Sequence, residues 1–132
     1  MRNFEQGLAS ALQRLRSDPT RWIVIAELER NPPLRYVQFL ADEDGTLAVE
    51  CVSNRYLKAG EQWRPDQERL LLELGWSLPR DDRPNWHFVG RTNEAVEQVR
   101  ELVHLTLAEL FGAGDDDRIE FKMAWSAPAG AD

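Results

Sequence analysis

Two histidines and one cysteine are the residues of this 132-residue chain best suited to metal binding or covalent catalysis. A structural zinc ion takes four nitrogen, sulfur or oxygen ligands. His87, His104 and Cys51 would therefore need a carboxylate as well, and no spacing along the chain brings them together. Cys51 shares the strand phase of Leu47 and Val49, which indicates a small buried side chain more than a nucleophile. We predict no metal, no cofactor and no catalytic residue.

Two acidic runs are the other candidates for ion binding. An EF-hand calcium loop needs glycine at its sixth position and glutamate at its twelfth, and in the DEDG segment at 42–45 the glycine comes too early. The Asp44-Gly45 pair instead predicts a hairpin turn, and the run at 115–117 predicts a solvated turn. Neither a GxSxG motif, a phosphate loop nor a dinucleotide fingerprint is present, so the sequence does not favour an enzyme.

Charge and hydropathy exclude several classes of partner. The net charge is −7 and the isoelectric point is near 4.9, which disfavours nucleic acids and anionic membranes because both require clustered basic residues. No window approaches the roughly 20 apolar residues of a membrane span, and the first residues lack the apolar core of a signal peptide. We predict a cytoplasmic protein, and a single cysteine agrees with that compartment.

The first half of the chain reads as one helix followed by a meander of strands. Apolar residues recur at helical spacing over 4–16, and Asn3 is placed to cap this helix. Segments rich in β-branched and aromatic residues then predict strands at 21–28, 35–41 and 46–52. Asn-Pro-Pro at 31–33 predicts the turn between the first two strands.

The second half alternates helices and strands. Pro65 suits the first position of a helix over 65–74, and the next strand is predicted at 85–89. Thr92 or Asn93 is placed to cap a long helix that reaches Phe111 and stops at Gly112. Alternating apolar and charged residues predict a last strand at 118–125, and the tail at 127–132 has the composition of a disordered end.

This order, α-β-β-β-α-β-α-β, predicts an α+β fold with an antiparallel sheet and helices packed mainly on one face. The length suits one domain with a single core, which we place at 1–126.

A short motif ends the second helix. Gly75 is placed in the left-handed position just past Leu74, so that Trp76 folds back onto Leu71. Prolines stiffen the connection that follows, and two aromatic residues alternate onto one face of the next strand. We assign Leu71, Gly75, Trp76, Pro79, Trp86 and Phe88 to this structural motif, with the two tryptophans in the core.

A few apolar residues lie off the phase of the predicted core. Leu105 falls among Glu94, Gln98 and Glu101, on the far side of the third helix from its apolar stripe. One exposed leucine is ordinary, but others lie off phase in the second helix and in the loop before it. We predict a partner-facing patch that includes Leu105, Tyr56, Leu57 and Leu72.

At Leu74-Gly75-Trp76, Pro79, Asn85-Trp86 and the long helix ending in Phe111-Gly112, the sequence resembles the YbjN-like proteins of actinobacteria. These small domains are grouped with type III secretion chaperones. The resemblance implies a helix and sheet sandwich that binds an extended or helical segment of another protein, without ATP and often as a dimer. It covers 1–113 in plan and 65–112 in motif.

The sequence departs from the family plan in its strands. The plan places two strands between the second and third helices, and only 85–89 is evident here. Two roles stay open for the strand at 118–125: it fills that gap, or it covers surface that relatives use for a partner.

The resulting hypothesis is a non-enzymatic domain that holds a client protein or peptide segment through apolar surface, alone or as a homodimer. The alternative is a small-ligand binder or an enzyme with a pocket between the third helix and the sheet. A polar pocket containing His87 or His104 would favour the alternative. An open apolar groove or sheet edge would favour the chaperone.

Overall fold

The computed structural model describes residues 1–29, 35–91 and 94–125. Along the chain the elements are α1 (Phe4–Ser17), β1 (Trp22–Leu28), β2 (Val37–Ala41), β3 (Thr46–Cys51), the 3-10 helix η1 (Asn54–Tyr56), α2 (Pro65–Leu74), β4 (Trp86–Arg91), α3 (Val96–Glu109) and β5 (Ile119–Trp125). The strands form one sheet in the order β4-β3-β2-β1-β5, and all neighbours are antiparallel. The α+β class and the order of elements are thereby confirmed.

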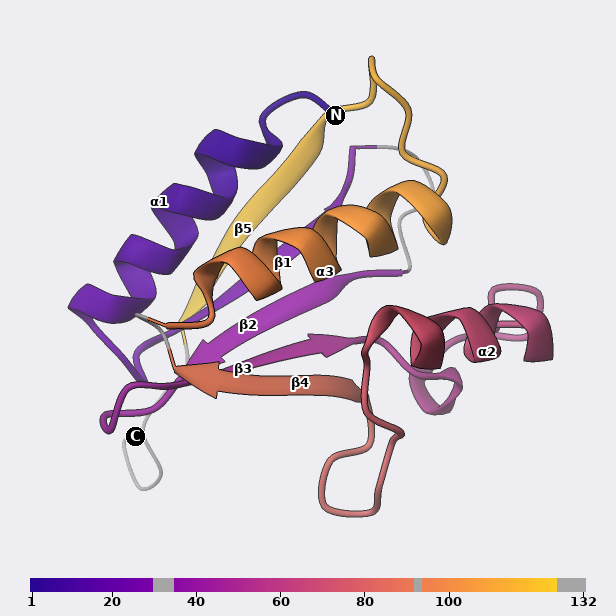
Figure 1. Cartoon of the computed structure of the whole chain (residues 1–132), viewed down its shortest axis with the longest axis horizontal. Coiled ribbons are helices and arrows are strands. Elements are labelled where there is room, and N and C mark those ends of the chain that lie inside the picture. The colour runs from indigo at the N-terminus through magenta and orange to yellow at the C-terminus, as the bar shows by residue number, and fades with distance from the viewer. Residues whose placement is uncertain (30–34, 92–93, 126–132) are drawn as a thin grey trace.

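The helices occupy one side of this sheet. Figure 1 shows α1 and α3 side by side over one face, with α2 beyond the end where β3 leaves the sheet and β4 enters it. An ion pair between Glu5 of α1 and Arg100 of α3, at 3.3 Å, joins the two helices across their exposed sides. None of the helices in the described part of the chain has the length and hydropathy needed to cross a bilayer.

Local signals placed the elements to within two residues of their observed ends, except at the start of the third helix. The third helix ends at Glu109, earlier than predicted, because the amide of Phe111 bonds to the carbonyl of Thr106, five residues back, in place of the helical bond to Leu107. Gly112 follows with a φ of 75° and stops the helix. The predicted turn at 31–33 and the tail at 127–132 lie outside the described residues. The prediction that Thr92 or Asn93 caps the third helix is wrong, because the helix begins at Val96 and Ala95 occupies its N-cap position.

The start of α1 differs from its prediction in one contact. Asn3 stands at the N-cap position, but its side chain makes no capping hydrogen bond. It donates instead to the carbonyl of Ile119 at 3.1 Å, because the start of the helix lies against β5. The helix also lies close to β5 at Gly7, where an added Cβ would lie only 2.2 Å from the ring of Phe121.

The core fills the space between the helices and the covered face of the sheet. Residues paired across neighbouring strands point to the same face, and Val24, Phe39 and Val49 form such a row with no exposed surface. The predicted stripe of α1 packs above them. Its buried residues are Phe4, Leu8, Ala11, Leu12 and Leu15.

The strand β5 lies at the edge of the sheet opposite β4. It pairs with β1 along its whole length, from Trp22↔Trp125 to Leu28↔Ile119, so it does not fill the place beside β4. Ser77 stands there instead and forms a single antiparallel bridge with His87. The second strand implied by the resemblance is thus reduced to one residue of the connection between α2 and β4.

Candidate binding surface

The end of α2 is held against α3 by Trp76. Trp76 is 2% exposed. Its indole Nε1 donates a hydrogen bond to Oγ1 of Thr106 at 2.8 Å, and the hydroxyl of Thr106 in turn donates to the carbonyl of Leu102 at 2.7 Å. The indole therefore buries its area without leaving its polar atom unpaired. This contact fixes the spacing between the two helices.

Gly75 provides the turn that brings Trp76 into this place. Its φ of 120° is in the region that favours glycine. The amide of Gly75 donates to the carbonyl of Leu72, and the amide of Trp76 donates to that of Leu71, both at 3.1 Å. This pair of bonds is the Schellman pattern, which satisfies carbonyls that the end of a helix would otherwise leave unpaired.

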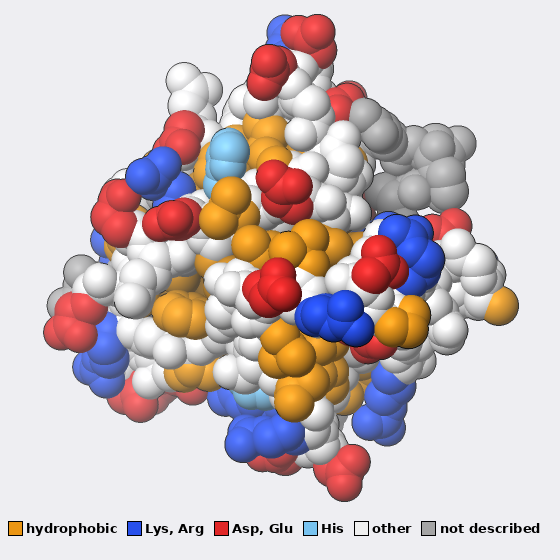
Figure 2. All heavy atoms as spheres, turned by 45° about the vertical axis from the view of Figure 1, so that its right-hand side comes forward, with side chains coloured by type: hydrophobic (Ala, Val, Ile, Leu, Met, Phe, Trp, Pro, Cys, Tyr) orange, Lys and Arg blue, Asp and Glu red, His pale blue; other side chains and the backbone are white. Residues whose placement is uncertain are grey.

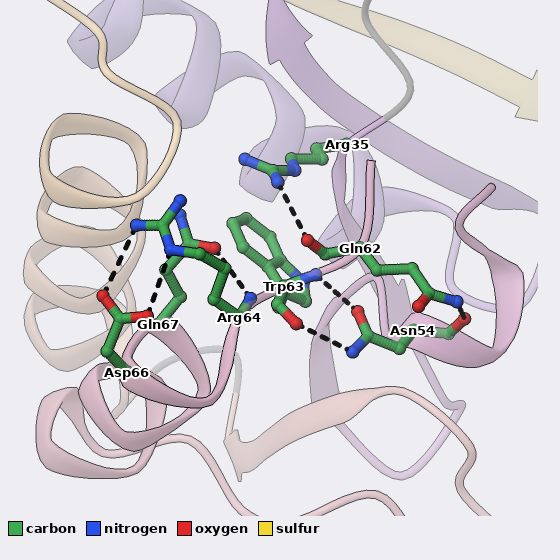
Figure 3. Close-up of polar contacts among 7 residues, drawn as sticks. All are labelled: Arg35, Asn54, Gln62, Trp63, Arg64, Asp66 and Gln67. Atoms are coloured by element: carbon green, nitrogen blue, oxygen red, sulfur yellow. Dashed lines mark hydrogen bonds and ion pairs between the residues drawn. The ribbon is translucent and has the colours of Figure 1, made fainter. Parts of the chain in front are cut away.

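The start of α2 is fixed by a second buried tryptophan, Trp63, in the loop that precedes the helix (Figure 3). The side chain of Asn54 accepts a hydrogen bond from the amide of Trp63 at 2.6 Å and donates to its carbonyl at 3.0 Å. The indole Nε1 donates to the carbonyl of Val52. The guanidinium of Arg35 lies 4.0 Å from the ring centroid, and burial lowers the pKa of this arginine. Phe111 lies beside the same ring.

The first turn of α2 carries the predicted helix-start residues. Pro65 occupies the first helical position. The amide of Arg64 donates to the side chain of Gln67 at 2.9 Å (Figure 3), which ties the first turn to the residue before it. Both ends of α2 are therefore anchored by residues close to them in sequence.

Beside the second anchor, Trp76, the surface opens into a groove of about 300 Å³, between the C-terminal end of α2 and the middle of α3. Its apolar lining consists of Leu74, Phe88, Leu102 and Leu105, and Gly75, Gln98 and Glu101 complete it. Figure 2 shows hydrophobic side chains gathered on this side of the molecule, over α2 and α3, with acidic side chains among them. The groove has the character of a site for apolar side chains.

The structure does not gather the four predicted contact residues in one patch. Leu105 is half-buried rather than fully exposed, because it lines the groove. Leu72 is 45% exposed on α2 and Tyr56 is 53% exposed on η1. The prediction that Leu57 is exposed is wrong: it is 7% exposed, because the turn of η1 folds the loop inward and the amide of Leu57 bonds back to Asn54.

The reactive side chains lie away from this groove. Cys51 is fully buried, and burial raises the pKa of its thiol well above the usual range. His87 lies on the face of the sheet opposite the core, yet it is only 7% exposed. The rings of His104 and of Phe4 on α1 pack edge to face, with 5.2 Å between their centroids. Within the described ranges, no group of three His, Cys, Asp or Glu residues could hold a metal ion.

The face of the sheet that points away from the helices carries a second apolar feature, a row of side chains that crosses all five strands. Register pairs Ala124 with Ile23, Leu40 with Ala48, and Ala48 with Val89. The ladder between β1 and β2 continues from its Val24↔Phe39 pair to set Ile23 beside Leu40. Val89 is 45% exposed and the other four are half-buried. We call these five residues, Val89, Ala48, Leu40, Ile23 and Ala124, the open-face row.

A protein-family model described as T3SS (YopN, CesT) and YbjN peptide-binding chaperone 3, or TY-Chap3, matches residues 2–122. No curated protein and no solved structure matches the chain. The family match extends from the residues before α1 into β5, so it includes both helices of the groove and nearly the whole sheet. It confirms the resemblance to YbjN-like chaperones, which are binding proteins rather than enzymes. The chain therefore belongs to the TY-Chap3 family of peptide-binding chaperones.

Proposed function

We propose that this chain holds a segment of a client protein by taking its apolar side chains into the groove between α2 and α3. The observation that carries the proposal is the lining by Leu74, Phe88, Leu102 and Leu105 beside solvent-exposed Gly75. Transfer of one large apolar side chain from water into such a site contributes about 1.5–3 kcal/mol. One or two anchors would give reversible binding, as a holding function requires.

The rigidity of the walls supports the same function. Trp76 and Thr106 fix the distance between the two helices, and the Gly75 turn fixes the end of α2. A preformed groove does not have to be ordered when the client binds, which reduces the entropic cost of association.

A small-ligand or enzymatic role has less support at this groove. Ligand pockets usually hold about 300–1,000 Å³ and combine apolar walls with several convergent polar groups. The groove lies at the lower limit of that range, and its polar lining is Gln98 and Glu101. Neither His87 nor His104 lines it.

The test compares Leu105, which lines the groove, with Leu72, which is exposed on α2 outside it. Peptides would be selected from a random library on the full-length chain, and their affinities measured by fluorescence anisotropy. Leu105→Glu places a charge in the apolar lining, and we expect it to weaken binding about tenfold or more. Leu72→Glu adds the same charge to an exposed position of α2 outside the lining and should leave affinity unchanged.

Equal affinities for wild type and Leu105→Glu would refute the groove as the contact surface. Amide chemical shifts of the isotope-labelled chain would then show whether peptide adds along β5 at the sheet edge instead. Circular dichroism melting of both variants controls for misfolding.

We also propose that the chain self-associates through the open-face row. A two-fold axis parallel to the strands would set Val89 against Ala124 of the second copy, Ala48 against Ile23, and Leu40 against itself. Large side chains then meet small ones, which is how packed layers interdigitate. Because only one row is apolar, we expect a weak, concentration-dependent dimer.

Sedimentation velocity over a range of concentrations tests the dimer. Leu40→Glu should leave only monomer, Leu105→Glu should not change the association, and high salt should not weaken an apolar contact. A wild-type chain that is monomeric at every concentration would rule out the dimer and leave the groove proposal standing.

A further inference from the structure

Glu101 lines the groove between α2 and α3, Glu73 is the chain neighbour of the lining residue Leu74, and neither carboxylate forms an ion pair with a described residue. On α3 the only lysine or arginine is Arg100, and it is paired with Glu97 of the same helix at 2.8 Å and with Glu5 of α1 at 3.3 Å. Glu101 lines the groove and is exposed. Among the described residues it forms no ion pair.

The end of α2 adds to this negative charge. Its last turn contains no basic residue, and Glu73 directly precedes the groove residue Leu74. The C-terminal end of a helix carries a partial negative charge, so a carboxylate there is unfavourable for the helix itself. Arg69 stands four positions earlier, where it could have compensated Glu73. In the described part of the chain Glu73 nevertheless has no ion-pair partner.

A positively charged ligand would give these unpaired carboxylates a partner. A lysine or arginine beside an apolar anchor would place its charge near Glu73 and Glu101, while its methylene stem covers the apolar rim. An acidic segment would meet two carboxylates and a helix C-terminus at once. The net charge of −7 repels it further.

We propose, resting on the function proposed above, that the groove selects client segments in which basic residues flank an apolar anchor. The groove supplies the binding free energy through Leu74, Phe88, Leu102 and Leu105. Glu73 and Glu101 supply the preference for one sign of charge. Selectivity of this kind depends on ionic strength, whereas the apolar contribution does not.

Three synthetic peptides test the preference. They share a central Leu-Trp-Leu anchor in a neutral Ala/Ser sequence and carry two flanking residues that are both Lys, both Gln or both Glu. Affinity for the full-length chain would be measured by anisotropy at low salt and at 1 M salt. We expect the Lys peptide to bind best and the Glu peptide least. Each flanking charge should change affinity about two- to fivefold, and the differences should vanish at 1 M salt.

Charge-neutral variants locate the effect. Glu73→Gln combined with Glu101→Gln should remove the preference for the Lys peptide and leave the affinity of the Gln peptide unchanged. Glu97→Gln is the matched control, because this exposed glutamate of the same helix is already paired with Arg100. It should keep the preference.

Each outcome separates the two proposals. If all three peptides bind equally and Leu105→Glu abolishes binding, the groove holds segments without charge selection and the present inference is wrong. A Lys preference that persists in the Glu73 and Glu101 double variant also overturns it. If no peptide binds, or Leu105→Glu has no effect, the groove function fails and this inference fails with it.

Discussion

A buried tryptophan holds each end of α2, but the surroundings of the two tryptophans differ. At the first end Trp63 is enclosed, with Asn54 bonded to its backbone, Arg35 over its ring and Phe111 beside it. At the second end Trp76 is equally buried, but the residues beside it leave an open groove. Tryptophan therefore sets the position of the helix at both ends, and only the second end borders the groove.

This contrast predicts that stability and binding reside in different residues. Substitutions of the anchors should unfold the domain, and substitutions of the groove should affect binding with little loss of stability.

The largest effect is expected for Trp76→Ala. Truncation of a buried aromatic side chain typically costs about 3–5 kcal/mol of unfolding free energy, and here it also leaves the hydroxyl of Thr106 without its donor. Denaturant unfolding would measure it. A loss under about 1 kcal/mol would contradict the anchoring role.

Gly75→Val should be the next most destabilising change. A β-branched residue at a φ of 120° is strained by about 1–3 kcal/mol, and the strain falls on the turn that delivers Trp76. The melting temperature should drop. Gly114→Ala is the control, because Gly114 has no positive φ and an added Cβ there meets its nearest atom at an ordinary 3.5 Å. Equal melting temperatures for the two variants would disprove the role of the turn.

Asn54→Ala tests the closed end of α2. It removes both side-chain bonds to Trp63, and unpaired backbone groups in a partly buried place cost about 1–3 kcal/mol. Urea unfolding followed by tryptophan fluorescence is a suitable measurement. A variant as stable as wild type would mean that water replaces the amide and that this end is less closed than the contacts indicate.

The smallest stability effects are expected for Leu72→Ser and Leu105→Ser. Leu72 is exposed, so its loss should fall within about 0.5 kcal/mol. Leu105 is half-buried, so Leu105→Ser should lower the free energy of unfolding by about 1 kcal/mol. Unfolding of the two variants side by side would show the ranking. A loss at Leu105 as large as that at Trp76 would abolish the distinction between anchor and surface.

The sequence by itself determined the elements and, apart from the ends of α3, their bounds. Helical spacing of apolar residues, the Asp44-Gly45 turn and Pro65 act through neighbours in the chain, so they can be recognised without knowledge of the fold. The left-handed position at Gly75 is local in the same way. Leu105 could be singled out because it departs from the period of its own helix.

Only the tertiary structure decided which elements meet. Periodicity carries no information on strand neighbours, so the pairing of β5 with β1 and the replacement of a strand by Ser77 were not predictable. The enclosure of Trp63 and Leu57 depends on the turn of η1, which the loop composition did not signal. The groove likewise combines α2, β4 and α3. Contacts between residues distant in sequence arise from packing of whole elements, and this is why the proposed binding groove appears only in the folded molecule.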